Sequence, residues 1–357
     1  MNDSGSSRQQ SMTQLATSAA VLGRLAHVSN VRGAPALGER LVDLDRWIRA
    51  DLAAFESELA TVPRGARMVH AAAHHLLDLR GKHLRPLCVA LTSRFGEGFT
   101  AQARALAVAV ELVHSATLLH DDVVDLAERR RGQPAACTVY GNAASIFAGD
   151  WLLVTALRRI ASANVDGLLD RMLAVIDEMI VAESVQLERR GKIAGAREDY
   201  FAIVEGKTAA LFRWAMVAGA RVAKLPAAAE ATLERYGLHL GVAFQAVDDE
   251  LDFASDTGKD ALTDLREGKI TFPLVVALER EPSLRGRIEA LLAADTPNRD
   301  ELGSVAAAVR SSGALAETRG LAEQHVQRAL EALEELPAGE ARDALVTVAL
   351  ASLERTS

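Results

Sequence analysis

The chain has 357 residues, of which 49% are hydrophobic and 4% aromatic, so it can bury the core of one large domain or of two ordinary ones. Its 40 basic and 48 acidic side chains leave a net charge of −8, which argues against a general nucleic-acid-binding protein. The two cysteines, Cys88 and Cys137, form no disulfide or metal-ligand pattern, so we expect a reducing, cytoplasmic environment.

Residues 1–36 are rich in Ser, Gln, Gly and Ala with little periodicity, so we expect a loose extension without the features of a signal peptide. From residue 37 to residue 357, apolar side chains recur at the helical period, and Gly or Pro interrupts them at intervals. No segment alternates as a strand would. No run of about 18 apolar residues predicts a transmembrane segment, although peripheral membrane contact stays open. The sequence therefore predicts one all-α domain, a single large helical bundle.

The helical run that ends in LLHDDVVD, residues 118–125, carries three aspartates behind apolar residues. On a helix, Asp121 and Asp125 project from one face, and His114 lies farther back on that face. Asp122 lies between them in the sequence. Because the burial of like charges is costly, this cluster is either solvated or holds a cation.

The run GVAFQAVDDELD, residues 241–252, repeats the same spacing with Asp248, Asp249 and Asp252, and Gln245 lies one turn earlier. One such pentapeptide would usually be a solvated helix end, but two of them behind apolar helices favour a shared function. Oxygen ligands without Cys or His suit Mg²⁺, which keeps waters and bridges carboxylates to phosphate oxygens.

Basic residues accompany both acidic clusters. Arg binds phosphate through paired hydrogen bonds, and Lys binds it as a point charge. These residues therefore indicate one polyanion bound through metal and a second bound directly, with surface ion pairing as the alternative for Arg129 and Lys269. The candidates are Lys82, Arg85, Arg129, Arg130, Arg131, Lys207, Lys259, Arg266 and Lys269, with Thr208 and Asp264 beside them.

In order and spacing, these motifs resemble those of the trans-isoprenyl diphosphate synthases, the polyprenyl synthetase family, and most of all its long-chain, octaprenyl-type members. The matching segments are GKHLRP, LLHDDVVD with RRRGQPA, GNAAS with AGD, GKTAALF, FQAVDDELD and GKDALTDLREGKITFP. The resemblance covers roughly residues 40–357. It implies the isoprenoid synthase type of fold, a helical bundle around a deep central cavity, usually in a homodimer.

The resemblance also implies an activity: Mg²⁺-dependent, head-to-tail condensation of isopentenyl diphosphate with an allylic prenyl diphosphate, repeated to lengthen an all-trans chain. By position, the Mg²⁺ ligands would be Asp121, Asp125 and Asp248, with Asp122, Asp249 and Asp252 beside them. The allylic diphosphate would be held by Arg130, Lys207, Thr208, Gln245 and Lys259. Isopentenyl diphosphate would be held by Lys82, Arg85, His114 and Arg131. Phe244 would flank the reacting carbons, and Thr208 and Gln245 would stabilise the allylic cation.

Three positions depart from the family pattern. His83 stands where a second basic residue usually follows Gly-Lys, Arg80 precedes Gly81 where a glycine is usual, and Leu262 stands where a glycine is common. None of these changes removes a metal ligand, so we expect activity.

Two rival interpretations share parts of the pattern. A class I terpene cyclase also ionises an allylic diphosphate, but its second motif would place Ser or Thr at Asp252 and Glu at Asp256, and it needs no isopentenyl site. A catalytically silent partner subunit should have lost carboxylates, whereas both clusters are whole.

The length of the product should depend on the wall of the cavity beneath the first cluster. The wall residues, moving back from Asp121, would be Thr117, Ala116, Val113 and Ala109, and one helical turn advances about 5.4 Å. In the family that the chain resembles, a bulky aromatic residue at the Ala116 position is associated with short products. We therefore expect a product in the heptaprenyl to decaprenyl range, with geranylgeranyl as the alternative and a cavity floor formed by Phe147 or Trp151.

Overall fold

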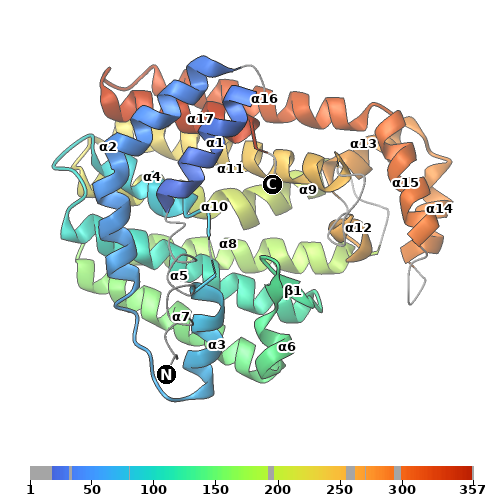
Figure 1. Ribbon diagram of the computed structural model, residues 1–357, viewed down its shortest axis with the longest axis horizontal. Coiled ribbons are helices and arrows are strands. Elements are labelled where there is room, and N and C mark those ends of the chain that lie inside the picture. Colours follow the sequence, from blue (N-terminus) through green and yellow to red (C-terminus); the bar gives the residue numbers. More distant parts are fainter. Residues whose placement is uncertain are drawn as a thin grey trace, which may run out of the picture.

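The computed structural model confirms the prediction of an all-α bundle (Figure 1). It describes residues 18–31, 34–79, 81–191, 197–254, 262–269, 271–292 and 299–355. Across these ranges the β structure consists of one hairpin of two strands. No helix in the same ranges combines the length and the hydropathy needed to cross a membrane.

The elements follow one another along the chain with short connections. They are α1 (Ser18–Val31), α2 (Pro35–Leu59), α3 (Met68–Leu77), α4 (Leu84–Ser93), α5 (Ala101–Val124), β1 (Arg129–Arg130), β2 (Gln133–Pro134), α6 (Ala136–Tyr140), α7 (Asn142–Ala163), α8 (Leu168–Arg189), α9 (Arg197–Ile203), the π-helix η1 (Val204–Ala209), α10 (Ala210–Val222), α11 (Ala227–Ala254), α12 (Thr263–Arg266), α13 (Phe272–Arg280), α14 (Leu284–Leu292), α15 (Arg299–Ser311), α16 (Ala314–Leu333) and α17 (Glu340–Leu353).

Two long helices, α5 and α11, carry the two aspartate motifs in their last turns. Helix α5 packs against α4, α7 and α10, while α11 packs against α10, α16 and α17. Ala103, Ala107 and Ala109 of α5 are fully buried, and such small side chains let neighbouring helices approach closely. Because α10 contacts both long helices, it fixes the position of one aspartate motif relative to the other.

The N-terminal helix α1 corrects one expectation. Residues 1–36 were expected to form a loose extension, and this is wrong for Ser18–Val31, which lie beside α2 (Figure 1). Leu22 and Ala26, one turn apart, are buried in the main core. The sequence gives little sign of this helix because its apolar stripe is short, so its stability comes from packing against the bundle rather than from strong amphipathicity.

The hairpin corrects the expectation that no segment forms a strand. Its strands pair Arg129 with Pro134 and Arg130 with Gln133, and strands of two residues are too short to show alternation. Arg131 and Gly132 form the turn with φ of 51° and 77°, as a tight two-residue hairpin turn requires.

Two other residues beside the predicted motifs also hold the left-handed conformation. His83 has φ of 46° at the start of α4, and Leu262 has φ of 59° at the start of α12. The family that the chain resembles commonly has glycine at the Leu262 position. The positive φ of Leu262 gives a physical reason, because glycine adopts positive φ without steric cost.

Candidate active site

Carboxylates from both aspartate motifs line one cavity of about 210 Å³. Asp121 and Asp125 reach it from α5 and Asp249 reaches it from α11. Both motifs lie at helix C-termini, where the backbone carbonyls add negative potential. The other polar residues that line the cavity are Arg130, Gln186, Arg189, Asp199, Tyr200, Lys207, Thr208, Gln245, Asp264, Lys269 and Thr271. The structure therefore brings together four of the residues predicted to hold the allylic diphosphate, while Lys259 lies outside the described residues.

Each carboxylate of the first motif contacts a cation from a different element. Asp121 Oδ2 lies 3.3 Å from Lys207 Nζ, and Asp122 Oδ1 lies 2.5 Å from Arg130 Nη2. Asp125 Oδ2 lies 2.7 Å from Lys269 Nζ. Asp122 is only 1% exposed, so its role is to hold Arg130 at the edge of the cavity rather than to face the cavity itself.

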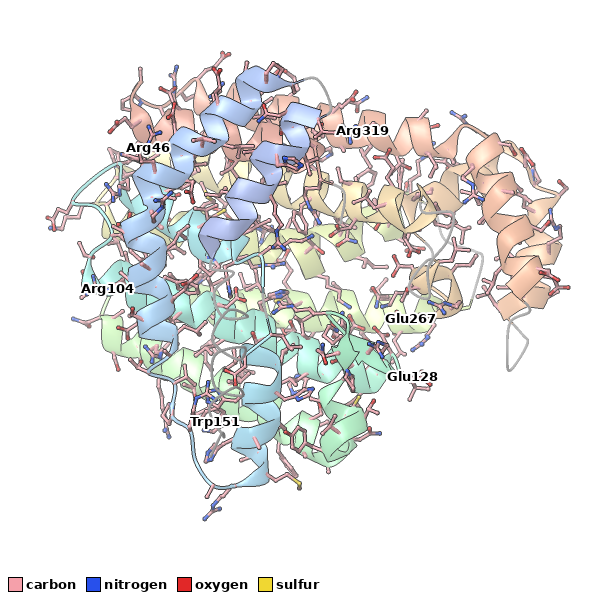
Figure 2. All side chains as sticks on the ribbon, in the orientation of Figure 1. Arg46, Arg104, Glu128, Trp151, Glu267 and Arg319 are labelled. Carbon is pink, nitrogen blue, oxygen red and sulfur yellow. The ribbon has the colours of Figure 1, made fainter. Side chains whose placement is uncertain are left out.

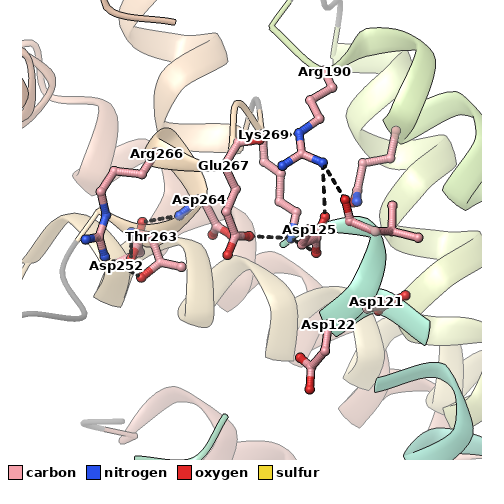
Figure 3. A network of polar contacts seen from close by, with 12 residues as sticks. Asp121, Asp122, Asp125, Arg190, Asp252, Thr263, Asp264, Arg266, Glu267 and Lys269 are labelled. Atoms are coloured by element: carbon pink, nitrogen blue, oxygen red, sulfur yellow. Dashed lines mark hydrogen bonds and ion pairs between the residues drawn. The ribbon is translucent and has the colours of Figure 1, made fainter. Parts of the chain in front are cut away.

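Lys269 and Arg190 approach Asp125 from two sides (Figure 3). Lys269 also donates to Glu267, and Arg190 donates to the backbone carbonyl of Val124 at 3.0 Å. Burial alone would lower the pKa of Lys269, but Asp125 and Glu267 outweigh it and raise that pKa. Lys269 is therefore a cation of the site, whereas Arg129 donates to the Gly132 carbonyl within the hairpin.

The three carboxylates of the second motif have three different surroundings: Asp249 lines the cavity, Asp248 pairs with Arg355 and Asp252 pairs with the backbone. Asp248 Oδ1 lies 2.5 Å from Arg355 Nη2, and Asp249 Oδ1 accepts a hydrogen bond from Gln245 Nε2 at 2.8 Å. Asp252 accepts hydrogen bonds from the backbone N–H groups of Thr263 (3.0 Å) and Asp264 (3.3 Å). Asp252 thus fixes the start of α12, and its predicted role as a metal ligand stays a prediction.

Burial of several carboxylates beside one cavity raises their pKa values. It raises the pKa of Asp121, with Lys207 opposing and Glu183 adding to the shift. It also raises the pKa of Asp249 to about 7. Burial and the nearby Asp252 raise the pKa of Asp264 to about 8. A cation in this cavity would therefore stabilise the ionised carboxylates.

A stretch of π-helix, η1, presents Lys207 and Thr208 to the cavity. Such bulges inside α-helical runs are frequent at functional sites. Thr208 Oγ1 donates to Gln245 Oε1 at 2.9 Å, and Gln245 in turn donates to Asp249. This chain of hydrogen bonds orients the Gln245 amide, as the predicted role of Gln245 requires.

Replacement of Gly206 with alanine should displace Lys207. A Cβ at Gly206 would lie 2.8 Å from Ala182 Cβ and 3.3 Å from the Glu178 carbonyl oxygen on α8, so η1 would have to move away from α8. We expect turnover to fall by about tenfold or more, because about 1.4 kcal/mol of lost transition-state stabilisation slows a reaction tenfold. Steady-state kinetics of Gly206→Ala would measure this fall. Gly23→Ala, where a Cβ meets nothing within 4 Å, is the matched control. Unchanged turnover in Gly206→Ala would contradict the role of the bulge.

The residues predicted to hold isopentenyl diphosphate form a second cationic group beside the first motif. The Arg85 guanidinium lies 4.7 Å from the Phe212 ring, and Lys82 Nζ lies 5.9 Å from the Phe244 ring. Arg131 Nη1 donates to the Leu79 carbonyl at 3.1 Å. Burial, together with Arg355 and Arg131, lowers the pKa of Lys82 to about 8.

His114 belongs to the same group. Burial and the nearby Arg85 lower the pKa of His114 well below its usual range. The imidazole of His114 is therefore close to the Arg85 guanidinium and the Glu111 carboxylate.

Arg355 was missed by the sequence reasoning. It is 4% exposed, and its guanidinium lies 3.8 Å from the Phe244 ring and contacts Asp248. A single arginine near the chain end gives no pattern in the sequence, so this contact could not be predicted. Phe244, predicted to flank the reacting carbons, therefore has both Arg355 and Lys82 close to its ring.

The predicted chain-length residues lie in the packed core below the cavity. Val113 and Ala116 are at most 1% exposed, Thr117 Oγ1 donates to the His114 carbonyl, and Leu118 forms the cavity wall on α5. Phe147 is 63% exposed, so the expectation that it forms the floor within this chain is wrong. Trp151, labelled in Figure 2, lies in a different part of the molecule from Glu267 at the active site.

Known proteins resemble this chain over most of its length. A sequence model of the family described as Polyprenyl synthetase matches residues 66–309. Heptaprenyl diphosphate synthase component 2 of Geobacillus stearothermophilus is 34% identical over 310 residues, which covers 85% of this chain and 95% of that protein. Octaprenyl diphosphate synthase of Escherichia coli is 32% identical over 293 residues, covering 81% and 90%. A crystal structure of a polyprenyl synthase from Caulobacter crescentus, complexed with calcium and isoprenyl diphosphate, has a TM-score of 0.83 and 34% identity, covering 88% of this chain and 97% of that one.

Proposed function

The chain belongs to the polyprenyl synthetase family and is a prenyltransferase, and on this basis we propose that it joins isopentenyl diphosphate head to tail onto an allylic prenyl diphosphate with the help of Mg²⁺. Repetition of this step would give an all-trans polyprenyl diphosphate. The observation that carries the proposal is the single cavity lined by carboxylates of both motifs together with Arg130 and Lys207. A cytoplasmic location fits the two free cysteines.

The first chemical step would be departure of the allylic diphosphate. Arg130, Lys207 and Lys269 surround the cavity and would donate hydrogen bonds to the leaving oxygens, where negative charge develops. Ile203 and Val204 add an apolar wall that keeps water from the allylic cation.

The second step would form the new carbon–carbon bond. Lys82, Arg85 and Arg131 would hold isopentenyl diphosphate so that its double bond attacks the allylic cation, which the oxygens of Thr208 and Gln245 stabilise. A proton then leaves the new chain. The released diphosphate would accept it, since the motifs contain no obvious protein base.

The donor set of the site fits Mg²⁺. Asp121, Asp125 and Asp248 offer carboxylate oxygens, the ligands that this ion prefers. No three His, Cys, Asp or Glu side chains in the described ranges converge to form a complete metal cage. This arrangement suits Mg²⁺, which usually completes its coordination with waters and substrate phosphates. When bound, Mg²⁺ supplies positive charge to the leaving diphosphate. The related Caulobacter structure, described as holding calcium and isoprenyl diphosphate, supports the pairing of a divalent cation with a diphosphate.

A second copy of the chain is the proposed partner. Leu173, Ile180 and Leu187 recur every seven residues along α8 and are 48%, 63% and 55% exposed, and on α7 Phe147 and Val154 are 63% and 46% exposed. Stripes of exposed apolar side chains on adjacent helices are typical of helix–helix interfaces. Because one relative is named a synthase component, the alternative is that a different protein binds this surface of α7 and α8.

The product is proposed to lie in the heptaprenyl to decaprenyl range, with geranylgeranyl as the alternative. Val113, Ala116 and Thr117 leave the wall below the first motif free of aromatic rings. Two relatives are named for heptaprenyl and octaprenyl products, which supports a long chain.

The test is to incubate the purified chain alone with isopentenyl diphosphate, Mg²⁺ and each allylic primer in turn, and to identify the products by mass spectrometry. We expect long polyprenyl diphosphates that require both substrates. A hydrocarbon formed without isopentenyl diphosphate would indicate a cyclase. If product formed only after a second protein was added, this chain would be one component of a mixed enzyme. Light scattering on the same preparation would give the number of copies.

A further inference from the structure

A carboxylate outside the aspartate motifs lies beneath the cationic group predicted to bind isopentenyl diphosphate. Glu111 is on α5, well before Asp121, and is 3% exposed within an otherwise apolar run. It contributes to neither aspartate motif. A buried carboxylate is costly unless cations compensate it.

The groups that compensate Glu111 come from three separate elements. Glu111 Oε1 lies 3.1 Å from His83 Nδ1, in the loop before α4. Burial alone would raise the pKa of Glu111, but His83 and, less strongly, His114 and Arg131 outweigh it and hold that pKa below its usual range. Glu111 in turn raises the pKa of Arg85, against the stronger effect of burial. Glu111 therefore interacts with the loop before α4, with α4 itself and with the hairpin turn.

The loop before α4 and the hairpin turn, which Glu111 joins, are in close contact. A Cβ at Gly81 would lie 3.1 Å from both Arg131 Nη1 and His83 Cε1, so His83 and Arg131 approach Gly81 together. Arg131 also donates to the carbonyl of Leu79. His83 and Arg131 both hold positive φ, a conformation that persists only where the surroundings enforce it. The contact with Glu111 is one such constraint on His83.

We propose that Glu111 is a positioning residue for isopentenyl diphosphate: through His83 it fixes the loop that carries Lys82, and the start of α4 that carries Arg85, against the hairpin that carries Arg131. Glu111 does not touch the substrate. Its carboxylate balances cations that would otherwise repel one another, and so keeps them at the spacing of one diphosphate. The inference rests on the proposed function, since it takes these cations to be the isopentenyl site.

The test compares Glu111→Gln, His83→Asn and the double variant, with KM and kcat measured for each substrate separately. In each single variant we expect KM for isopentenyl diphosphate to rise about tenfold, with KM for the allylic primer nearly unchanged. In the double variant, the rises in KM from Glu111→Gln and His83→Asn should not add, because removal of both partners leaves no unpaired group behind. His83→Arg, which places a guanidinium beside Glu111, should retain most of the affinity. If Glu111→Gln fails to fold, His83→Asn still tests the contact, because His83 is only half-buried and its replacement should leave the protein folded.

Two further variants separate the possible failures. Asp51→Asn removes another buried carboxylate, which pairs with Arg94 at 2.7 Å, and should lower the unfolding temperature without changing either KM. If Glu111→Gln behaved like Asp51→Asn, Glu111 would be structural only and the inference would be wrong. If Arg131→Ala raised KM for isopentenyl diphosphate and Glu111→Gln did not, the inference would fail while the proposed function stood. If neither variant changed that KM, the assignment of the isopentenyl site itself would be wrong.

Discussion

Asp121→Ala and Asp248→Ala are each expected to lower turnover by several orders of magnitude. Each replacement removes a proposed metal ligand from one side of the leaving diphosphate, and each loss of about 1.4 kcal/mol in transition-state stabilisation slows the reaction tenfold. The Asp248 change also removes the carboxylate that Arg355 contacts, whereas Lys207 keeps its contact with Glu183 when Asp121 is lost. Single-turnover measurements at saturating Mg²⁺ would separate a slower chemical step from weaker binding.

Asp43→Ala provides the control for these variants. The Asp43 side chain is 71% exposed and, among the described residues, pairs with its helix neighbour Arg46, so its loss should leave turnover unchanged. Thermal unfolding of all three variants would show whether the protein remains folded. Near-normal rates in a folded Asp121→Ala or Asp248→Ala protein would refute the metal assignment.

Ala116→Phe is expected to shift the products to farnesyl or geranylgeranyl length while the first condensation still proceeds. Ala116 is 1% exposed in the core beneath the first motif, and a ring there would block the path of the growing chain. Overpacking of this kind typically costs about 1–3 kcal/mol of stability, which a protein of this size can tolerate. Chromatography of the products, together with the rate of the first condensation, would measure both effects.

A graded series at Ala116 makes this test sharper. Ala116→Ser changes the volume little and should leave the product length unaltered, whereas Ala116→Leu should give intermediate products. If Ala116→Phe made the same long chains as the parent, the growing chain would not pass this position. Because Val113 and Ala116 are packed rather than cavity-lining in this structure, the result would also show whether the core opens to admit the product.

The sequence was sufficient for those parts of the site that depend on local spacing. The aspartate motifs could be assigned because residues three and four apart share a helix face, and the cations of GKTAALF and RRRGQPA because they follow recognisable motifs. The structure places Asp121, Asp125, Lys207 and Arg130 at the same cavity.

The features that the sequence did not reveal all depend on distant contacts. Arg355 reaches Asp248 across 107 residues of sequence. The π-helix at Lys207 depends on the close approach of Gly206 to α8, for which no local signal exists. Helix α1 is stable because Leu22 and Ala26 are buried. Glu111 gave a partial signal, since it is a charged residue in the apolar run VAVELV, but its partner His83 could be found only from the fold.

The left-handed residues around the site have a consequence for attempts to make this protein more heat-resistant. His83, Arg131 and Leu262 each hold a backbone conformation that costs a residue other than glycine about 1 kcal/mol or more. Replacement of such residues with glycine would remove this backbone cost. At Leu262, where the family resemblance implies glycine, the exchange should be harmless if the loss of a buried side chain costs little stability. At Arg131 the same exchange would remove a proposed substrate contact, and at His83 it would remove the partner of Glu111, so we expect a screen for thermostability alone to select variants with a weakened diphosphate site.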